Sequence, residues 1–187
     1  MKKITIILLA MLLVASIGQA ASAKGSVGAF AGYNYFREGL SAVVNGEYEF
    51  VNWFSLVGEA GFNFINIFNK DESNRVEYSI SLTGKFNFLS IEKFNLGAEL
   101  FVGLVNISDL EVIVVPGIYA NIVVFEKLKL ALELGAAVYS SDAGFGFMPK
   151  IAFFEASYML SDSISIGIGI GVKIPFGGIG MSVDYKF

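Results

Sequence analysis

The stretch that decides the fold is Ile179–Phe187, IGMSVDYKF, which alternates without a break. Its odd-numbered residues are apolar or aromatic, and the residues between them are Gly, Ser, Asp and Lys. Because successive side chains of a β-strand point to opposite faces of the sheet, this period of two predicts a strand with one apolar face and one polar face.

Further segments of the chain alternate in the same way, and most are longer than the roughly five to six residues of a soluble strand. They suit tilted membrane-crossing strands of about 9–11 residues. The predicted count is ten, and eight is the alternative, because the first two segments are rich in glycine and the last two are short. The ten predicted strands are 25–36, 40–50, 53–68, 75–88, 94–107, 111–125, 128–140, 149–159, 163–174 and 178–187.

The connections between these segments fall into two alternating kinds. One kind is short and framed by aromatic or large aliphatic residues, at 50–53, 88–94, 125–128 and 160–164. The other kind is more polar or glycine-rich, and 140–149 is its longest example. This asymmetry is typical of the periplasmic turns and extracellular loops of an up-and-down barrel with an even number of strands.

Composition agrees with strands that lie in a membrane. Hydrophobic residues make up 55% of the chain, with 18 Phe, 8 Tyr and 21 Gly. After residue 23 no run of about 18 apolar residues occurs, so no spanning helix is expected. In lipid every backbone polar group needs a partner within the protein, which leaves a closed barrel. A soluble β-sandwich is the alternative fold. The 17 acidic against 13 basic residues argue against a nucleic-acid partner.

The amino-terminal segment has the pattern of a secretory signal peptide. Lys2 and Lys3 precede the apolar run Ile4–Ile17, and the small residues 21–23 supply a cleavage site after Ala23. The run is too short for a transmembrane helix of about 20 residues. Residues 1–23 are therefore predicted to be a cleaved signal peptide, and residues 24–187 a single barrel domain.

On the terminal strand and the signal segment, the chain resembles small outer-membrane β-barrel proteins of Gram-negative bacteria, of the opacity-protein and small-porin type. The resemblance implies an all-β, closed, antiparallel, up-and-down transmembrane barrel in the outer membrane. It also implies that Tyr185 and Phe187 form the assembly signal read by the outer-membrane assembly machinery, with outer-membrane lipid as the other partner. Structural integrity, small-solute passage and host contact all occur in this family, and the subfamily stays open.

Charged residues fall in the inward phase of the predicted strands, three to six residues from the short turns. At about 3.3 Å per residue they occupy one lower-middle layer of the lumen. Arg75 and Lys173 lie nearer the outer mouth. The members of the layer are Glu47, Glu59, Lys85, Glu99, Glu133, Glu155 and Asp184.

Six carboxylates that are close together and dry cannot all be ionised. One interpretation is a hydrated polar plug, in which the carboxylates bond with Lys85 and with the inward residues Asn63, Asn87, Asn95 and Asn121. Another is a narrow cation-preferring constriction for small cations or solutes, because rings of Asp and Glu select cations. An oxygen-ligand metal site would need a ligand loop that is not visible, so neither metal nor cofactor is expected.

The chain has no His and no Cys, so the usual catalytic bases and nucleophiles are missing and no enzyme activity or catalytic residue is expected. The alternative function is surface adhesion or recognition through extracellular loops, above all 140–149. Two further expectations concern the strands. Pro116 removes a ladder hydrogen bond, which predicts a bulge there. The glycines that alternate between the aliphatic residues of 163–174 face the lumen and make room for bulky side chains from across it.

Overall fold

A computed structural model describes residues 24–35, 38–65, 75–105, 111–141, 144–173 and 176–187. For residues 75, 105, 111, 137–141, 144–151, 173 and 176 it describes the backbone alone. The signal peptide assigned to residues 1–23 lies outside the described residues. None of the described residues belongs to a helix long and apolar enough to span a membrane.

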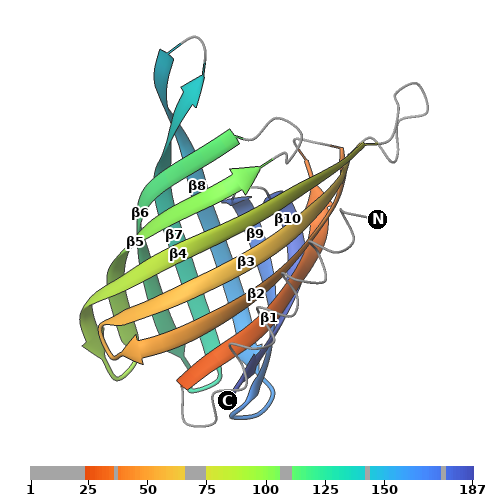
Figure 1. The fold of residues 1–187 in the computed structure, drawn as a ribbon. Coiled ribbons are helices and arrows are strands. Elements are labelled where there is room, and N and C mark those ends of the chain that lie inside the picture. Colours follow the sequence, from red (N-terminus) through yellow and green to blue (C-terminus); the bar gives the residue numbers. More distant parts are fainter. Residues whose placement is uncertain (1–23, 36–37, 66–74, 106–110, 142–143, 174–175) are drawn as a thin grey trace.

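The described chain is all β and forms ten antiparallel strands in one closed barrel. Figure 1 shows the strands strongly tilted and following one another around the barrel in chain order. The prediction of a closed up-and-down barrel of ten strands is confirmed, and the eight-strand alternative is wrong. The strands are β1 (Lys24–Asn34), β2 (Gly39–Val51), β3 (Phe54–Ile65), β4 (Arg75–Ile91), β5 (Phe94–Val105), β6 (Glu111–Val124), β7 (Leu128–Ser141), β8 (Gly144–Met159), β9 (Ile164–Lys173) and β10 (Phe176–Lys186).

The two ends of the barrel differ. Short turns at 52–53, 92–93, 125–127 and 160–163 join the strands at the lower end in Figure 1, which we call the turn end. We call the opposite end the loop end. The positions of the short turns agree with the alternation of connections in the sequence.

The first and last strands close the barrel, as the sequence predicts. β1 pairs with β10 from Ser26 opposite Lys186 to Asn34 opposite Gly178. Beyond this ladder, the backbone N–H of Phe187 donates to the carbonyl of Gly25 over 3.1 Å. The alternating stretch that opens the sequence argument is therefore the seam of the barrel.

The exterior of the barrel is apolar and its interior carries the charge. Outward side chains are exposed on every part of the wall, for example Leu82 at 49%, Ile168 at 55% and Met181 at 65%. Among the strand side chains that the structure describes, each charged one shares the inward phase with buried Ser, Asn or Glu. This polarity is the reverse of a soluble barrel and is the one that a hydrocarbon surrounding requires.

The prediction of a bulge at Pro116 is wrong. Leu100 pairs with Pro116 in an unbroken β5–β6 ladder. On the other side, the β6–β7 ladder runs from Val114 opposite Val138 to Gly117 opposite Gly135, in the same register before and after the proline. The missing N–H therefore interrupts one ladder locally and needs no extra residue. The register shift lies instead between β7 and β8, at Gly135 and Ala136.

The prediction of a long loop at 140–149 is also wrong. The β7–β8 ladder continues to Ser141 opposite Gly144, so most of this segment is a β-hairpin. Figure 1 shows this hairpin extending past the neighbouring strands at the loop end. Backbone pairing sets this boundary, because the ladder continues through the Gly and Pro residues that indicate a loop in the sequence. At the turn end, a register shift between Asn87 and Leu89 lets β4 continue to Ile91, beyond its predicted end.

Candidate functional site

The structure places the predicted lumenal residues on the inward faces of seven strands, β2, β3, β4, β5, β7, β8 and β10. Their registers bring several of them next to one another, such as Lys85 opposite Glu99 on the adjacent strand. The residues Glu59, Glu99 and Glu133 are buried. We call the set the charged layer: Glu47, Glu59, Lys85, Glu99, Glu133, Glu155 and Asp184.

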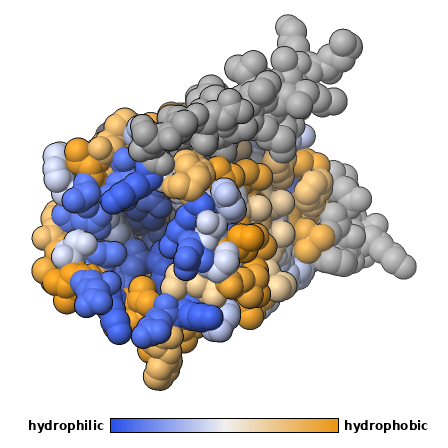
Figure 2. Space-filling model, turned by 90° about the horizontal axis from the view of Figure 1, so that it is seen from below, coloured by the Kyte–Doolittle hydropathy of each residue, from blue (hydrophilic) through white to orange (hydrophobic). Residues whose placement is uncertain are grey.

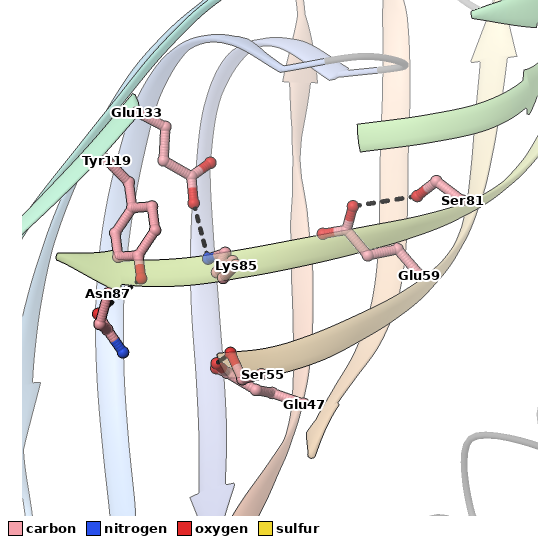
Figure 3. A network of polar contacts seen from close by, with 8 residues as sticks. All are labelled: Glu47, Ser55, Glu59, Ser81, Lys85, Asn87, Tyr119 and Glu133. Carbon is pink, nitrogen blue, oxygen red and sulfur yellow. Dashed lines mark hydrogen bonds and ion pairs between the residues drawn. The ribbon is translucent and has the colours of Figure 1, made fainter. Parts of the chain in front are cut away.

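The centre of the charged layer is an ion pair that reaches past two strands. Lys85 Nζ on β4 donates to Glu133 Oε1 on β7 over 3.1 Å, and the two side chains are 17% and 11% exposed (Figure 3). The same ammonium lies 5.2 Å from the ring centroid of Tyr119. The Tyr119 hydroxyl donates to Asn87 Oδ1 over 2.6 Å. One lysine thus compensates a carboxylate and is held against an aromatic ring.

Serine hydroxyls satisfy three other carboxylates of the charged layer. Ser55 donates to Glu47 over 2.6 Å. Ser81 donates to Glu59 over 3.2 Å, as Figure 3 shows. Ser182 donates to Glu155 over 2.5 Å from two strands away. A hydroxyl that donates to a carboxylate stabilises its ionised form. The layer therefore consists largely of partnered groups, as the interpretation of a polar plug requires.

Several charged residues of the lumen were missed by the sequence reasoning, among them Lys129, Lys186 and Glu77. Lys129 is four residues before Glu133 on β7, and its ammonium interacts electrostatically with Glu47 and Glu155. Lys186 follows Asp184 in the inward phase of β10, and the two also interact electrostatically. Glu77 is buried on β4 nearer the loop end. The same alternation that identified the charged layer contains the signal for all three. With the lysines added, the lumen is less acidic than the sequence analysis expected.

An apolar cluster lies next to the charged layer on its loop-end side. Phe101 is two residues beyond Glu99 on β5, and Phe153 is two residues beyond Glu155 toward the loop end of β8. The rings of Phe30 and Phe153 meet edge to face, with centroids 5.9 Å apart and an interplanar angle of 73°. We call the cluster the septum. Its members are Phe101, Ile113, Val115 and Phe153, with Phe30 packed against them.

Glycines of β9 and β10 make room for the septum. A Cβ added at Gly169 would lie 3.0 Å from a ring carbon of Phe30 and 3.1 Å from one of Phe153. A Cβ added at Gly180 would lie 2.6 Å from another ring carbon of Phe30. Inward glycines thus accommodate bulky side chains, as expected, but the rings come from β1 and β8, next to β10 and β9 in the wall, and not from across the lumen.

A buried polar cluster lies near the loop end. Asn34, Ser41 and Asn63 come from β1, β2 and β3 and are 1%, 2% and 2% exposed. Asn34 Nδ2 donates to Ser41 Oγ over 3.2 Å and to Asn63 Oδ1 over 3.4 Å, and Ser41 also donates to Asn63. This set, which we call the loop-end polar cluster, connects three strands beside the seam.

The remaining predicted residues lie at the ends of strands. Arg75 begins β4 and Lys173 ends β9, both at the loop end, and their side chains lie outside the described part. Tyr185 faces outward at 52% exposure and Phe187 lies over Gly25 at the seam. Within the described residues, no group of three or more acidic side chains is arranged to hold a metal ion.

Viewed from the turn end, the molecule has a hydrophilic centre surrounded by hydrophobic residues (Figure 2). No family model and no curated protein matches the chain. Solved structures do match. A bacterial polysaccharide outer membrane secretin is 12% identical with a TM-score of 0.47, and the match covers 88% of this chain and 65% of that one. Neisserial surface protein A (NspA) is 12% identical with a TM-score of 0.35, and the match covers 88% of this chain and 96% of that one. This chain thus spans just under two thirds of the first structure and is similar to both without being assigned to either family.

Proposed function

We propose that the chain is an integral outer-membrane β-barrel protein with a membrane-structural role. The observation that carries the proposal is the inverted polarity of the closed barrel, apolar outside and charged inside. The closed ladder pairs β1 with β10 and so leaves no free sheet edge. In a bilayer the backbone polar groups must be paired and the lipid-facing side chains must be apolar, and a closed sheet with an apolar exterior meets both requirements.

The contents of the lumen favour a filled barrel over a steadily open pore. The septum joins β5, β6 and β8 to β1 and contains Val115, which is fully buried. Beneath it, the Lys85–Glu133 pair extends past two strands. Barrels of about this size have an interior just wide enough for side chains to fill. We therefore expect the wild-type protein to give no steady conductance in a planar bilayer.

Cell fractionation and gel mobility test the location. The expressed full chain is expected in the outer-membrane fraction, with folded and boiled samples that migrate differently on a gel. Recovery in the periplasmic fraction with one heat-independent mobility would contradict the proposal.

We further propose that Tyr185 and Phe187 act in recognition by the outer-membrane assembly machinery. Phe187 completes the outward face of the strand that closes the barrel, where its backbone bonds to Gly25. Substituting Phe187→Ala is expected to lower the amount of folded barrel in cells. Phe62→Ala is the matched control, because it removes an outward ring from β3, which is not part of the seam. Equal losses for both variants would show a general effect of aromatic deletion.

A second candidate function is recognition at the cell surface through the β7–β8 hairpin. The observation that favours it is the ladder that continues to Ser141 opposite Gly144 at the loop end, where the hairpin projects in Figure 1. A variant with a shortened hairpin and an intact barrel tests the idea. Only a recognition role predicts that this variant binds host cells less while its membrane insertion is unchanged.

A further inference from the structure

The described lumen has three successive zones along the barrel axis. The charged layer lies nearest the turn end, the septum follows, and the loop-end polar cluster comes last. The septum thus separates two polar regions within one closed wall. Apolar constrictions of this kind stop ions by excluding water, without a mechanical plug.

We infer that Phe30 and Phe153 form a hydrophobic gate that closes a cation pathway through the barrel. The inference deepens the proposed membrane role, because a barrel that does not span a membrane has no pathway to close. The two rings come from β1 and β8, which are separated by β9 and β10 in the wall. Their edge-to-face contact at 5.9 Å therefore spans a sector of the lumen and does not follow from strand neighbourhood.

The wall beneath the two rings has no side chains. Gly169 on β9 and Gly180 on β10 are the residues that the rings lie against. Gly169 pairs with Gly180 in the β9–β10 ladder, so the two glycines form one continuous backbone surface. If the rings are removed, Gly169 and Gly180 supply no side chain to replace them.

The carboxylates on the turn-end side of the gate favour cations. Glu155 precedes the gate on the turn-end side and bonds to Ser182. Glu59, on the opposite wall, bonds to Ser81. Both side chains lie on the inward face of the wall, and the ammonium of Lys85 is engaged by Glu133. Ions in an opened pathway would therefore pass carboxylate oxygens that are hydrogen-bonded but negatively charged, and such oxygens attract cations.

Planar-bilayer recordings on the purified full-length barrel test the gate, with KCl as the electrolyte and a salt gradient to measure ion preference. The variant Phe30→Ala with Phe153→Ala is expected to give steady, cation-preferring steps that the wild type lacks. Adding Glu59→Gln is expected to reduce the cation preference of the opened variant without closing it. Phe30→Leu with Phe153→Leu is expected to stay closed, because leucine keeps the constriction apolar and bulky.

The matched control is Phe62→Ala with Phe154→Ala, two outward rings whose loss leaves the lumen unchanged. Heat-modifiable gel mobility establishes that each variant is folded and inserted. A folded, inserted Phe30→Ala/Phe153→Ala barrel that stays silent would overturn the gate and leave the structural role intact. Wild-type conductance equal to that of this variant would also overturn it. Failure of the wild type to insert would instead contradict the proposed function.

Discussion

Lys85 Nζ on β4 lies 3.1 Å from Glu133 Oε1 on β7, so one ion pair connects two strands that are not neighbours in the wall. The contact therefore links β4 to β7 through the lumen, past β5 and β6. It also ties the only lysine of the charged layer to one of its six carboxylates, whereas serine hydroxyls donate to three others, Glu47, Glu59 and Glu155.

The first prediction concerns this pair. Lys85→Met is expected to destabilise the folded barrel, because it leaves Glu133 beside a neutral side chain in a poorly solvated place. Removing one partner of a fully buried pair costs about 3–5 kcal/mol, and the partial exposure of this pair places the expected loss below that range. Urea-induced unfolding in lipid vesicles measures it.

A double-mutant cycle provides the control. The combination of Lys85→Met and Glu133→Gln is expected to be more stable than Lys85→Met alone, because no uncompensated charge remains. Additive losses would show that the two side chains do not interact energetically.

The second prediction concerns Gly171, which has a φ of 136°. A Cβ there would lie 2.9 Å from the Cα of Phe153 and 3.0 Å from the carbonyl carbon of Ala152. Gly171→Ala is expected to lower stability by roughly 1–3 kcal/mol, because a non-glycine residue is strained in this conformation. Gly58→Ala is the matched control, since its Cβ would meet nothing within 4 Å. Equal unfolding midpoints for the two variants would contradict the assigned strain.

The third prediction concerns the lipid-facing wall. Ile168→Lys places a charge on an outward position that is 55% exposed. The expected loss of folding stability in vesicles is about 2–4 kcal/mol, the value for a basic residue at the middle of a bilayer. Asp162→Lys, in the exposed turn at 160–163, is expected to have little effect. If both variants fold equally well, Ile168 does not face hydrocarbon.

The fourth prediction concerns Pro116. The β6–β7 ladder lacks pairs at Val115 and Pro116 although its register is continuous. Pro116→Ala restores a backbone N–H at this gap and is expected to raise stability by about 0.5–1.5 kcal/mol, the net value of one hydrogen bond. A lower unfolding midpoint would mean that the rigid φ of proline stabilises the strand more than the bond would.

Much of the fold follows from local pattern. Alternation predicts each strand and its inward phase, and the recurrence of short turns predicts the count, because these properties depend on residues close in sequence. The inward position of Glu59 comes from the same source, whereas that of Glu155 follows from the cost of a carboxylate that faces lipid. The wrong predictions at Pro116 and at 140–149 concern pairing between strands, which the sequence of a single strand does not encode. Whether a ladder keeps its register past a proline depends on the strand that it pairs with.

The sequence by itself determined the ten-strand alternation, the apolar exterior and the inward face on which the charges lie, since a period of two is fixed by the geometry of an extended chain. The tertiary structure alone decided which inward residues meet. The stagger of ten tilted strands brings Lys85 to Glu133, Ser182 to Glu155, and Phe30 to Phe153 over the glycines of β9 and β10. These contacts come from residues 27 to 123 positions apart in the chain, so only closure of the barrel brings them together.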